Sequence, residues 1–325
     1  MKFKVTGMDA DDESNIDNNG NVLGAKGGTE MMREGLLSRL NPSLSDKFNI
    51  ISSRVRDLSD NKKNVLWLHD TWDDPESQHL KEKESRDRFD KLVFVSNYQF
   101  QTYHLAHGID YREAVVLKNA IEPIPDYEKD KGDKINFIYH TTPHRGLELL
   151  VPSFKALYDH YGDMLHLDVY SSFNIYGWPQ RDEPYQKVFD MCDEHPGITN
   201  HGTVPNDEIR KALQKAHIFA YPNIWPETSC IALMEAMSAR CAIVTNNHAA
   251  LAETSANFAN MYQMDEDPNR HAQSFVNMCD AVIKDFWNER HEAKLNFQKI
   301  YADNFYSWGG RIPEWEGMLN SLLQK

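Results

Sequence analysis

The sequence predicts an α/β protein with two doubly wound domains, each built around a parallel sheet covered by helices. Short β-branched runs alternate with helical patterns along the chain, as they do in βαβ units. A charged, proline-bearing segment at residues 121–134 divides these runs into two series. The length of 325 residues, 41% of them hydrophobic, suffices for two cores.

The first series spans residues 1–120 and defines the first predicted domain. Its apolar runs predict strands at residues 3–6, 48–52, 65–68, 92–96 and 114–117. Its helical patterns predict helices at residues 29–40, 75–89 and 98–107. A polar stretch rich in Asp, Asn and Gly predicts a loop at residues 9–24.

The second series follows the predicted linker 121–134 and defines a second domain at residues 135–307. Its apolar runs predict strands at residues 135–139, 165–170, 217–221, 242–245 and 260–263. A long helical stretch is predicted from residue 268 to about residue 301.

The chain ends in a predicted helix at residues 308–325. Ile312, Trp315, Leu319 and Leu322 fall on one face of this helix. Because such a stripe needs a surface to cover, we expect the helix to pack back on the first domain.

Composition limits the classes of function. The formal net charge of −14 repels phosphate backbones, so strong nonspecific nucleic-acid binding is not expected. Four scattered cysteines without a CxxC pair predict neither a disulfide framework nor a zinc site, and favour a reducing, cytoplasmic compartment. No apolar run reaches the length of about 18 residues that a membrane span needs, and no signal peptide is recognisable.

The segment from Tyr221 to Ser238 carries the functional argument. It predicts a strand end, a proline-bounded loop and then a helix, with Thr228 or Ser229 as the N-cap. Glu227 lies on the loop. Glu235 lies in the second turn of an otherwise apolar helix, where an ionised carboxylate is unfavourable unless it is hydrogen-bonded.

This segment lies beyond the carboxyl end of a parallel strand, which is where doubly wound sheets bind ligands. A helix N-terminus there offers unpaired N–H groups to a diphosphate. A sugar nucleotide would supply hydroxyl groups for both carboxylates, from the ribose for Glu235 and from the sugar for Glu227. The alternative is that both glutamates merely pair with nearby basic residues, since the chain is acidic.

The segment resembles the Glu-x7-Glu signature of the retaining glycosyltransferase family 4. Residues 201–210, 216–222 and 251–253 also resemble segments of that family. The resemblance implies the GT-B fold, in which two Rossmann-like doubly wound domains face a central cleft. It also implies a metal-independent enzyme that moves a sugar from a UDP- or GDP-linked donor to an acceptor hydroxyl, with retention of anomeric configuration and without a cofactor.

The resemblance assigns roles to residues of the signature. In that family the first glutamate contacts the transferred sugar and the second binds the ribose, which gives these roles to Glu227 and Glu235. The residues between them present backbone amides to the donor, a role that falls to Thr228, Ser229 and Cys230.

Five further residues, on three predicted loops, are expected at the same site. Arg145 follows the strand at 135–139 and is the candidate for neutralising the departing diphosphate, while His140 stands where family members usually have Arg. His69 follows the strand at 65–68, next to Asp70, and matches a histidine that contacts the donor sugar. Gly27 and Gly28 resemble the glycine-rich first loop of the family, which approaches the donor phosphate or the acceptor.

The first domain is expected to bind the acceptor, which is a glycan, a lipid-linked sugar or a small molecule. Two other functions fit the same pattern. A GT-B sugar-nucleotide epimerase would convert the donor without an acceptor, and a catalytically silent protein would bind a nucleotide sugar without hydrolysing it. Metal binding is not expected, because no DxD motif is flanked by strand residues.

Overall fold

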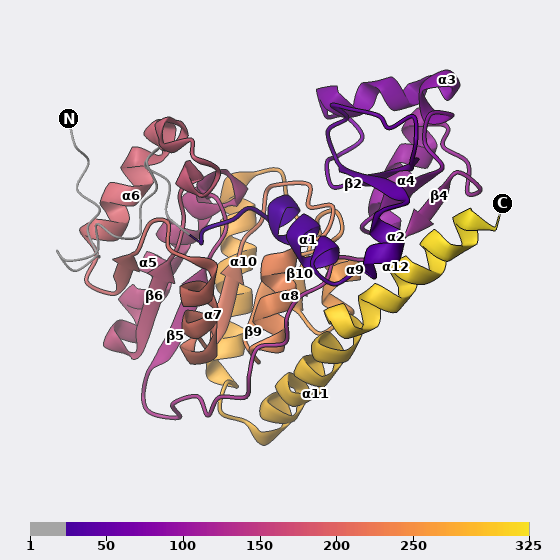
Figure 1. Ribbon diagram of the computed structural model, residues 1–325. Coiled ribbons are helices and arrows are strands. Elements are labelled where there is room, and N and C mark those ends of the chain that lie inside the picture. Colours follow the sequence, from indigo (N-terminus) through magenta and orange to yellow (C-terminus); the bar gives the residue numbers. More distant parts are fainter. Residues whose placement is uncertain (1–23, 325) are drawn as a thin grey trace.

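The computed structural model describes residues 24–324 and contains two parallel sheets within them (Figure 1). The four-stranded sheet has the order β1-β2-β3-β4, and the six-stranded sheet has the order β10-β9-β8-β5-β6-β7. The predicted α/β class with two parallel-sheet domains is confirmed. The predicted strand at residues 3–6, and the predicted loop at 9–24 except for its last residue, lie outside the described residues.

The first sheet contains short strands that pair in parallel with their neighbours in the sequence. Their bounds are β1 (Phe48–Ser52), β2 (Lys63–Leu68), β3 (Lys91–Phe94) and β4 (Ala114–Val116). Strand β2 is buried over five consecutive residues, as expected for a strand with both faces covered. The helices of this region are α1 (Gly28–Leu37), α2 (Pro42–Ser45), α3 (Lys83–Arg86) and α4 (Asn97–His107).

The prediction of one continuous helix at residues 75–89 is wrong. The chain instead forms a 3-10 helix, η2 (Pro75–Lys81), followed by the short helix α3. Glu82 between them has extended backbone angles, φ −85° and ψ 126°, which end one helix before the next begins.

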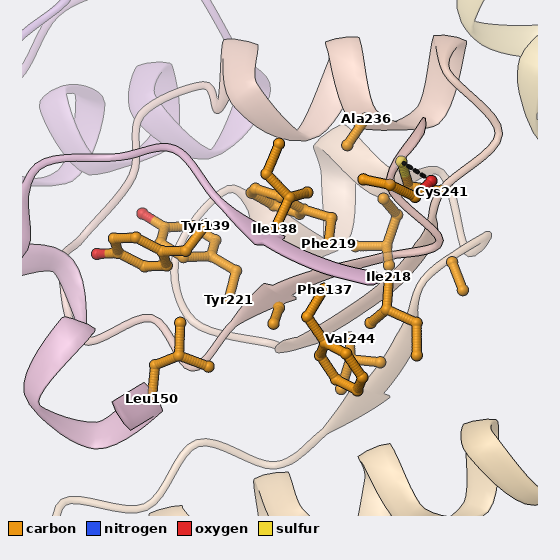
Figure 2. Packing of buried hydrophobic residues seen from close by; sticks show 14 of the residues in the cluster. Phe137, Ile138, Tyr139, Leu150, Ile218, Phe219, Tyr221, Ala236, Cys241 and Val244 are labelled. Carbon is orange, nitrogen blue, oxygen red and sulfur yellow. Dashed lines mark hydrogen bonds between the residues drawn. The ribbon is translucent and has the colours of Figure 1, made fainter. Parts of the chain in front are cut away.

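The second sheet places β5 (Ile135–Tyr139) between β8 and β6. The other strands are β6 (Leu165–Val169), β7 (Ile198–Asn200), β8 (Ile218–Tyr221), β9 (Ala242–Asn246) and β10 (Asn260–Tyr262). Figure 2 shows Leu150 and Ala236 on opposite sides of the buried strand residues, so helices cover both faces. The three-residue edge strand β7 was not predicted.

Helices of the second domain connect these strands. They are α5 (Leu147–Tyr161), α6 (Gln186–Asp193), α7 (Asn206–Lys215), α8 (Ile231–Ser238), α9 (Leu251–Ser255) and α10 (Pro268–Lys284). Short 3-10 helices lie at η3 (Pro143–Arg145), η4 (Gly162–Met164), η5 (Phe173–Tyr176) and η6 (Pro179–Tyr185). Of these, η3 and η5 follow the carboxyl ends of β5 and β6, where they contribute to the site described below.

The single long helix predicted from residue 268 to 301 is also wrong. The chain forms α10 and then α11 (Glu289–Phe305), with a break at residues 285–288. Asn288 caps α11 by accepting a hydrogen bond from the backbone N–H of Arg290. The break contains neither Gly nor Pro, so the usual signals for a helix end are missing from the sequence.

The segment predicted as a linker crosses from the first sheet to the second and is partly packed. Ile121 forms a bridge with Ser307, and Ile124 is 1% exposed in the core of the second domain. The first residues of the connection are therefore packed against the second domain.

The last helix, α12 (Trp308–Leu323), runs from the end of α11 along the first domain (Figure 1). Trp315, Leu319 and Leu322 are buried in one cluster with Trp67 of β2 and Leu36 of α1. The rings of Trp67 and Trp315 meet edge to face at 4.8 Å. A chain segment that follows the second domain thus completes the core of the first.

None of the helices within residues 24–324 is both long and apolar enough to cross a membrane.

Candidate active site

A cavity of about 710 Å³ lies between the two domains. It is lined by the loops that follow β1 and β2 in the first sheet and β5, β6 and β8 in the second, together with the first turns of α1 and α8. Both sheets therefore present the carboxyl ends of parallel strands to one space, the usual ligand-binding edge of such sheets. The cavity brings together all ten predicted site residues, which are Gly27, Gly28, His69, His140, Arg145, Glu227, Thr228, Ser229, Cys230 and Glu235.

Glu227 is 4% exposed and its carboxylate is held by two donors. Arg145 donates from Nη1 to Oε1 at 2.6 Å, and the hydroxyl of Tyr221 donates to the same oxygen. The backbone of Glu227 is also fixed, because its carbonyl accepts the N–H of Ala250 at 3.0 Å. The carboxylate therefore has a defined position at the cavity.

Arg145 ends η3, directly after β5. Burial alone would lower the pKa of its guanidinium, but Glu227 beside it holds that pKa well above the ordinary value. Arg145 is therefore cationic at any physiological pH. Its Nε is buried without a hydrogen-bond partner, so the side chain keeps an unused donor in the cavity.

Gly146 allows the Arg145 loop to approach the Glu227 loop. Its φ is 133°, a region that side chains disfavour, and an added Cβ would lie 2.2 Å from the carbonyl oxygen of Pro222. The Arg145–Glu227 pair thus depends on the glycine that directly follows Arg145.

Glu235 is 7% exposed and pairs with Arg210 of α7, whose Nη1 lies 3.0 Å from Oε1. Burial raises the pKa of Glu235, and the charge of Arg210 opposes that shift. Arg210 also donates to the carbonyls of Glu122 and Pro123, so it is anchored to the connection between the domains. Both glutamates of the signature therefore have basic partners in the protein itself, as the alternative reading of the sequence expected.

The predicted N-cap of α8 is wrong. The helix begins at Ile231 with Cys230 as the cap, and no side chain caps it. Thr228 instead donates its hydroxyl to the carbonyl of His69 at 2.7 Å, a bond between the two domains, and the hydroxyl of Ser229 is buried without a partner. The first N–H groups of α8 thus lack a side-chain cap and remain available for a ligand.

His69 and His140 both have a pKa below the ordinary value for histidine. Burial lowers the pKa of His69 to about 3 and that of His140 to about 4, so both rings are neutral near pH 7. The Nε2 atom of each is buried without a partner. His140 consequently cannot replace the positive charge that family members usually carry at its position, and it offers a neutral hydrogen-bonding group instead.

Gly27 and Gly28 lie where the two domains approach each other. Gly27 is the N-cap of α1 and makes no side-chain cap bond. An added Cβ at Gly27 would lie 2.3 Å from the ring of Tyr176, and one at Gly28 would lie 3.2 Å from Ile231. A side chain at Gly27 would thus clash with the second domain, and one at Gly28 would crowd it.

Several residues that line the cavity, or that pair with a residue lining it, were missed from the sequence. Arg210 lies in a segment that resembles the family, but nothing in its spacing paired it with Glu235. His144 stacks on Phe173 with ring centroids 5.1 Å apart and meets Trp225 edge to face at 4.6 Å. Tyr176 lies on η5, beyond a strand whose following loop carried no recognisable motif.

Potential metal ligands are not clustered. Within residues 24–324 no group of three or more His, Cys, Asp or Glu side chains is arranged to hold a metal ion.

The fold and the site define a GT-B protein, with two parallel-sheet domains whose carboxyl edges enclose one cavity. Residues 122–299, more than half of the chain, match the family described as "Glycosyl transferases group 1". The chain therefore belongs to the group 1 glycosyl transferases and is a glycosyltransferase. The prediction that the chain is a glycosyltransferase is confirmed, at the level of the group 1 family.

Solved structures share this fold at low sequence identity. A glycosyltransferase from Rickettsia africae matches with a TM-score of 0.70 and 14% identity, over 93% of this chain and 83% of that one. Anabaena HepE, in complex with UDP-glucose, matches with a TM-score of 0.62 and 13% identity, over 80% and 72%. The pneumococcal O-GlcNAc transferase GtfA, in complex with UDP and GlcNAc, matches with a TM-score of 0.59 and 12% identity, over 82% and 53%. No curated protein sequence matched this chain significantly.

Proposed function

We propose that this glycosyltransferase moves a sugar from a nucleotide-diphosphate sugar to an acceptor hydroxyl, with retention of configuration and without a metal ion. The observation that carries the proposal is the ion pair between Arg145 and the buried carboxylate of Glu227, next to a helix N-terminus without a side-chain cap in the cavity. A fixed cation next to free backbone N–H groups suits a diphosphate, and a fixed carboxylate suits sugar hydroxyls. The UDP found in two structures of the same fold supports a nucleotide donor.

The donor would bind along the start of α8. The diphosphate would accept hydrogen bonds from the backbone of Thr228, Ser229 and Cys230 and from the unused Nε of Arg145. The ribose hydroxyls would bind the carboxylate of Glu235. Glu227 would accept hydrogen bonds from the transferred sugar.

The remaining predicted residues would complete the donor site. His69 and His140 would contribute neutral hydrogen-bonding groups, since both rings carry a buried, unpartnered Nε2. Gly27 and Gly28 would keep the first turn of α1 close to the second domain. Uridine and guanosine donors are both compatible with this arrangement.

In the proposed reaction the bond between the sugar C1 and the diphosphate oxygen breaks, and a bond from C1 to the acceptor oxygen forms on the same face. The acceptor proton passes to the departing diphosphate. Arg145 and the helix N-terminus would stabilise the negative charge that develops there, in a site arranged before the reaction begins.

The proposal is tested by donor turnover. Purified protein is incubated with UDP-glucose, UDP-N-acetylglucosamine or GDP-mannose, with and without EDTA, and nucleoside diphosphate release is measured. We expect release from at least one donor, unchanged by EDTA, and a product whose anomeric configuration by NMR matches the donor. Release abolished by EDTA would contradict metal independence, and an inverted product would contradict retention.

A further inference from the structure

The first-domain wall of the cavity contains polar residues that the proposed donor site does not use. Strands β1 and β2 end side by side, with Ser52 opposite Trp67 in the parallel register. Beyond these ends lie Ser52 and Arg54 from one strand and Asp70 from the other, all lining the cavity. We call this surface, together with Asn119 after β4, the first-domain wall.

The backbone of this wall is held in an unusual conformation. Ser53 has a φ of 60°, in the left-handed region that residues with a side chain rarely occupy. The strained residue is fixed to β2, because its N–H donates to the carbonyl of Trp67 at 2.8 Å and its hydroxyl accepts the N–H of His69 at 3.1 Å. Such strain is concentrated at functional sites, where surrounding structure maintains it.

Three polar atoms of the wall lack a partner. They are Asp70 Oδ2, Ser52 Oγ and Asn119 Oδ1, each buried without a hydrogen bond within the described residues. Asn119 is only 3% exposed. Buried polar groups in native proteins are nearly always hydrogen-bonded, so these atoms indicate a ligand that supplies donors. Hydroxyl groups meet that need.

The wall lies against the proposed donor site. The hydroxyl of Thr228 donates to the carbonyl of His69, so the residues next to each of these, Glu227 and Asp70, belong to loops in direct contact. A group bound at Asp70 would therefore stand beside the transferred sugar. Trp225, 41% exposed on the Glu227 loop, lines the same cavity.

The charge of the wall selects against anions. Burial raises the pKa of the Asp70 carboxyl, and the nearby carboxylate of Asp74 raises it further, while a Ser53 hydrogen bond and the charge of Arg54 lower it. Asp74 also lines the cavity. Arg54 is exposed, so water weakens its attraction for an anion. Two carboxylates facing the acceptor position repel a phosphate or a uronate.

We propose that the first-domain wall binds a neutral sugar as the acceptor, with Asp70 accepting a hydrogen bond from a sugar hydroxyl and Trp225 covering part of the ring. The inference rests on the proposed transferase function. Asp70 positions the acceptor, and the proton of the attacking hydroxyl still passes to the departing diphosphate. Hydroxyl-to-carboxylate bonds are among the stronger hydrogen bonds, which suits a group that must be held during transfer.

The test compares Asp70→Asn with Asp60→Asn, a matched change at an exposed residue outside the cavity. The donor probes are UDP-glucose, UDP-N-acetylglucosamine and GDP-mannose. The acceptor probes are methyl glucoside, methyl mannoside and methyl galactoside, and the anionic probes are methyl glucuronide and glucose 6-phosphate. Nucleoside diphosphate release and glycosylated products are measured by coupled assay and mass spectrometry.

We expect at least one neutral glycoside to accelerate release and become glycosylated, and the anionic probes to have no effect. Asp70→Asn should lower kcat/KM for the acceptor by about tenfold or more, because it removes a charged hydrogen-bond acceptor. Asp60→Asn should leave both this kcat/KM and donor hydrolysis without acceptor within about twofold of the unmodified protein.

The outcomes separate this inference from the proposed function. If donors are hydrolysed but only anionic probes are glycosylated, or no neutral glycoside is, the neutral-sugar site is wrong and the transferase proposal stands. If Asp70→Asn transfers to neutral glycosides at the unmodified rate, Asp70 has no role. If no donor is hydrolysed, the proposed function fails and this inference fails with it.

Discussion

Arg145 and Glu227 form a direct ion pair, so a change to either residue affects the other. The Glu227 carboxylate is buried while the Arg145 side chain is 24% exposed, and removing Arg145 would leave the buried charge without its main partner, which is strongly unfavourable in a protein interior. The family resemblance and the positions after predicted strands assigned the two residues separate roles, Glu227 for the sugar and Arg145 for the diphosphate. Their direct bond could not be derived from the sequence, because it depends on how closely the loops after β5 and β8 approach.

Replacing Arg145 tests this ion pair. Arg145→Ala should lower turnover by about 100- to 1,000-fold, since it removes the proposed stabilisation of the leaving group. It should also lower the melting temperature, because Glu227 loses its main partner. The double variant Arg145→Ala/Glu227→Gln should recover part of that melting temperature and none of the activity. Calorimetry and donor hydrolysis measure the two effects, and unchanged turnover in Arg145→Ala would remove it from the site.

The buried histidines predict a pH dependence of stability. His69 and His140 have pKa values of about 3 and 4 in the folded protein, below the ordinary 6.5. The unfolded state therefore binds more protons below about pH 6.5, so folding stability falls as the pH decreases from there towards 4. At pH 5 each ring should account for about 2 kcal/mol at most of lost stability.

Variants show whether these rings cause the effect. His140→Asn should reduce the difference between the free energies of unfolding at pH 7 and pH 5, measured by urea denaturation. His160→Asn is the matched control, since His160 is exposed. An identical pH difference in His140→Asn and in the unmodified protein would show that the imidazole is not buried as the structure has it.

At the scale of elements, the sequence predicted strands better than helix ends. The expected strand at 135–139 coincides with β5, and that at 48–52 coincides with β1, because short β-branched runs between turn residues are distinctive. The helix at 268–301 was predicted without its break, since Asp285 to Asn288 contain no Gly or Pro. The end of α10 follows from tertiary packing that a local pattern does not record.

The first two backbone N–H groups of helix α4 donate hydrogen bonds to a carboxylate of the second domain. Glu253 of α9 accepts hydrogen bonds from the backbone N–H groups of Asn97 and Tyr98 at 2.9 Å, and also pairs with Lys118. These donors hold the pKa of Glu253 below its ordinary value despite the opposing effect of burial. The Glu253 carboxylate thus links the second domain to the first.

Removal of this cap should loosen the domain contact. Glu253→Ala is expected to lower the free energy of unfolding by about 1–2 kcal/mol, the usual range for a lost helix cap. It should also weaken donor binding, since the cavity walls come from both domains. The control is Glu266→Ala, which changes an exposed glutamate. Equal denaturation midpoints for the two variants would contradict the cap.

At the scale of the whole molecule, the site exists only where the two sheets face each other. The sequence placed ten residues at strand ends, and these meet in one cavity because the carboxyl ends of parallel strands share an edge. The sequence did not predict the close approach of Tyr176 to Gly27 or the ion pair between Arg210 and Glu235. The first contact joins segments of different domains about 150 positions apart, and the second joins α7 to α8 within the second domain, about 25 positions apart, so both depend on tertiary packing.

Helix α12 follows the second domain in the sequence but packs against the first domain. Its apolar stripe was visible in the sequence, and Trp315 of that stripe is 0% exposed against Trp67. Trp315→Ala should lower the free energy of unfolding by about 3–5 kcal/mol, as for other large cavities in a core. Trp287→Ala, at a half-exposed tryptophan, is the matched control. Denaturation curves that shift equally for both variants would show that α12 does not complete the first core.

The most direct test of the account is donor binding by the unmodified protein and by Glu235→Gln, measured as the thermal shift with UDP-glucose, UDP-N-acetylglucosamine and GDP-mannose. A ligand that binds only the folded state raises its stability in proportion to the logarithm of its concentration. The account predicts a shift from at least one sugar nucleotide, and a much smaller shift for Glu235→Gln, since the ribose would lose its charged partner. No shift with any donor, or an equal shift in both proteins, would contradict it.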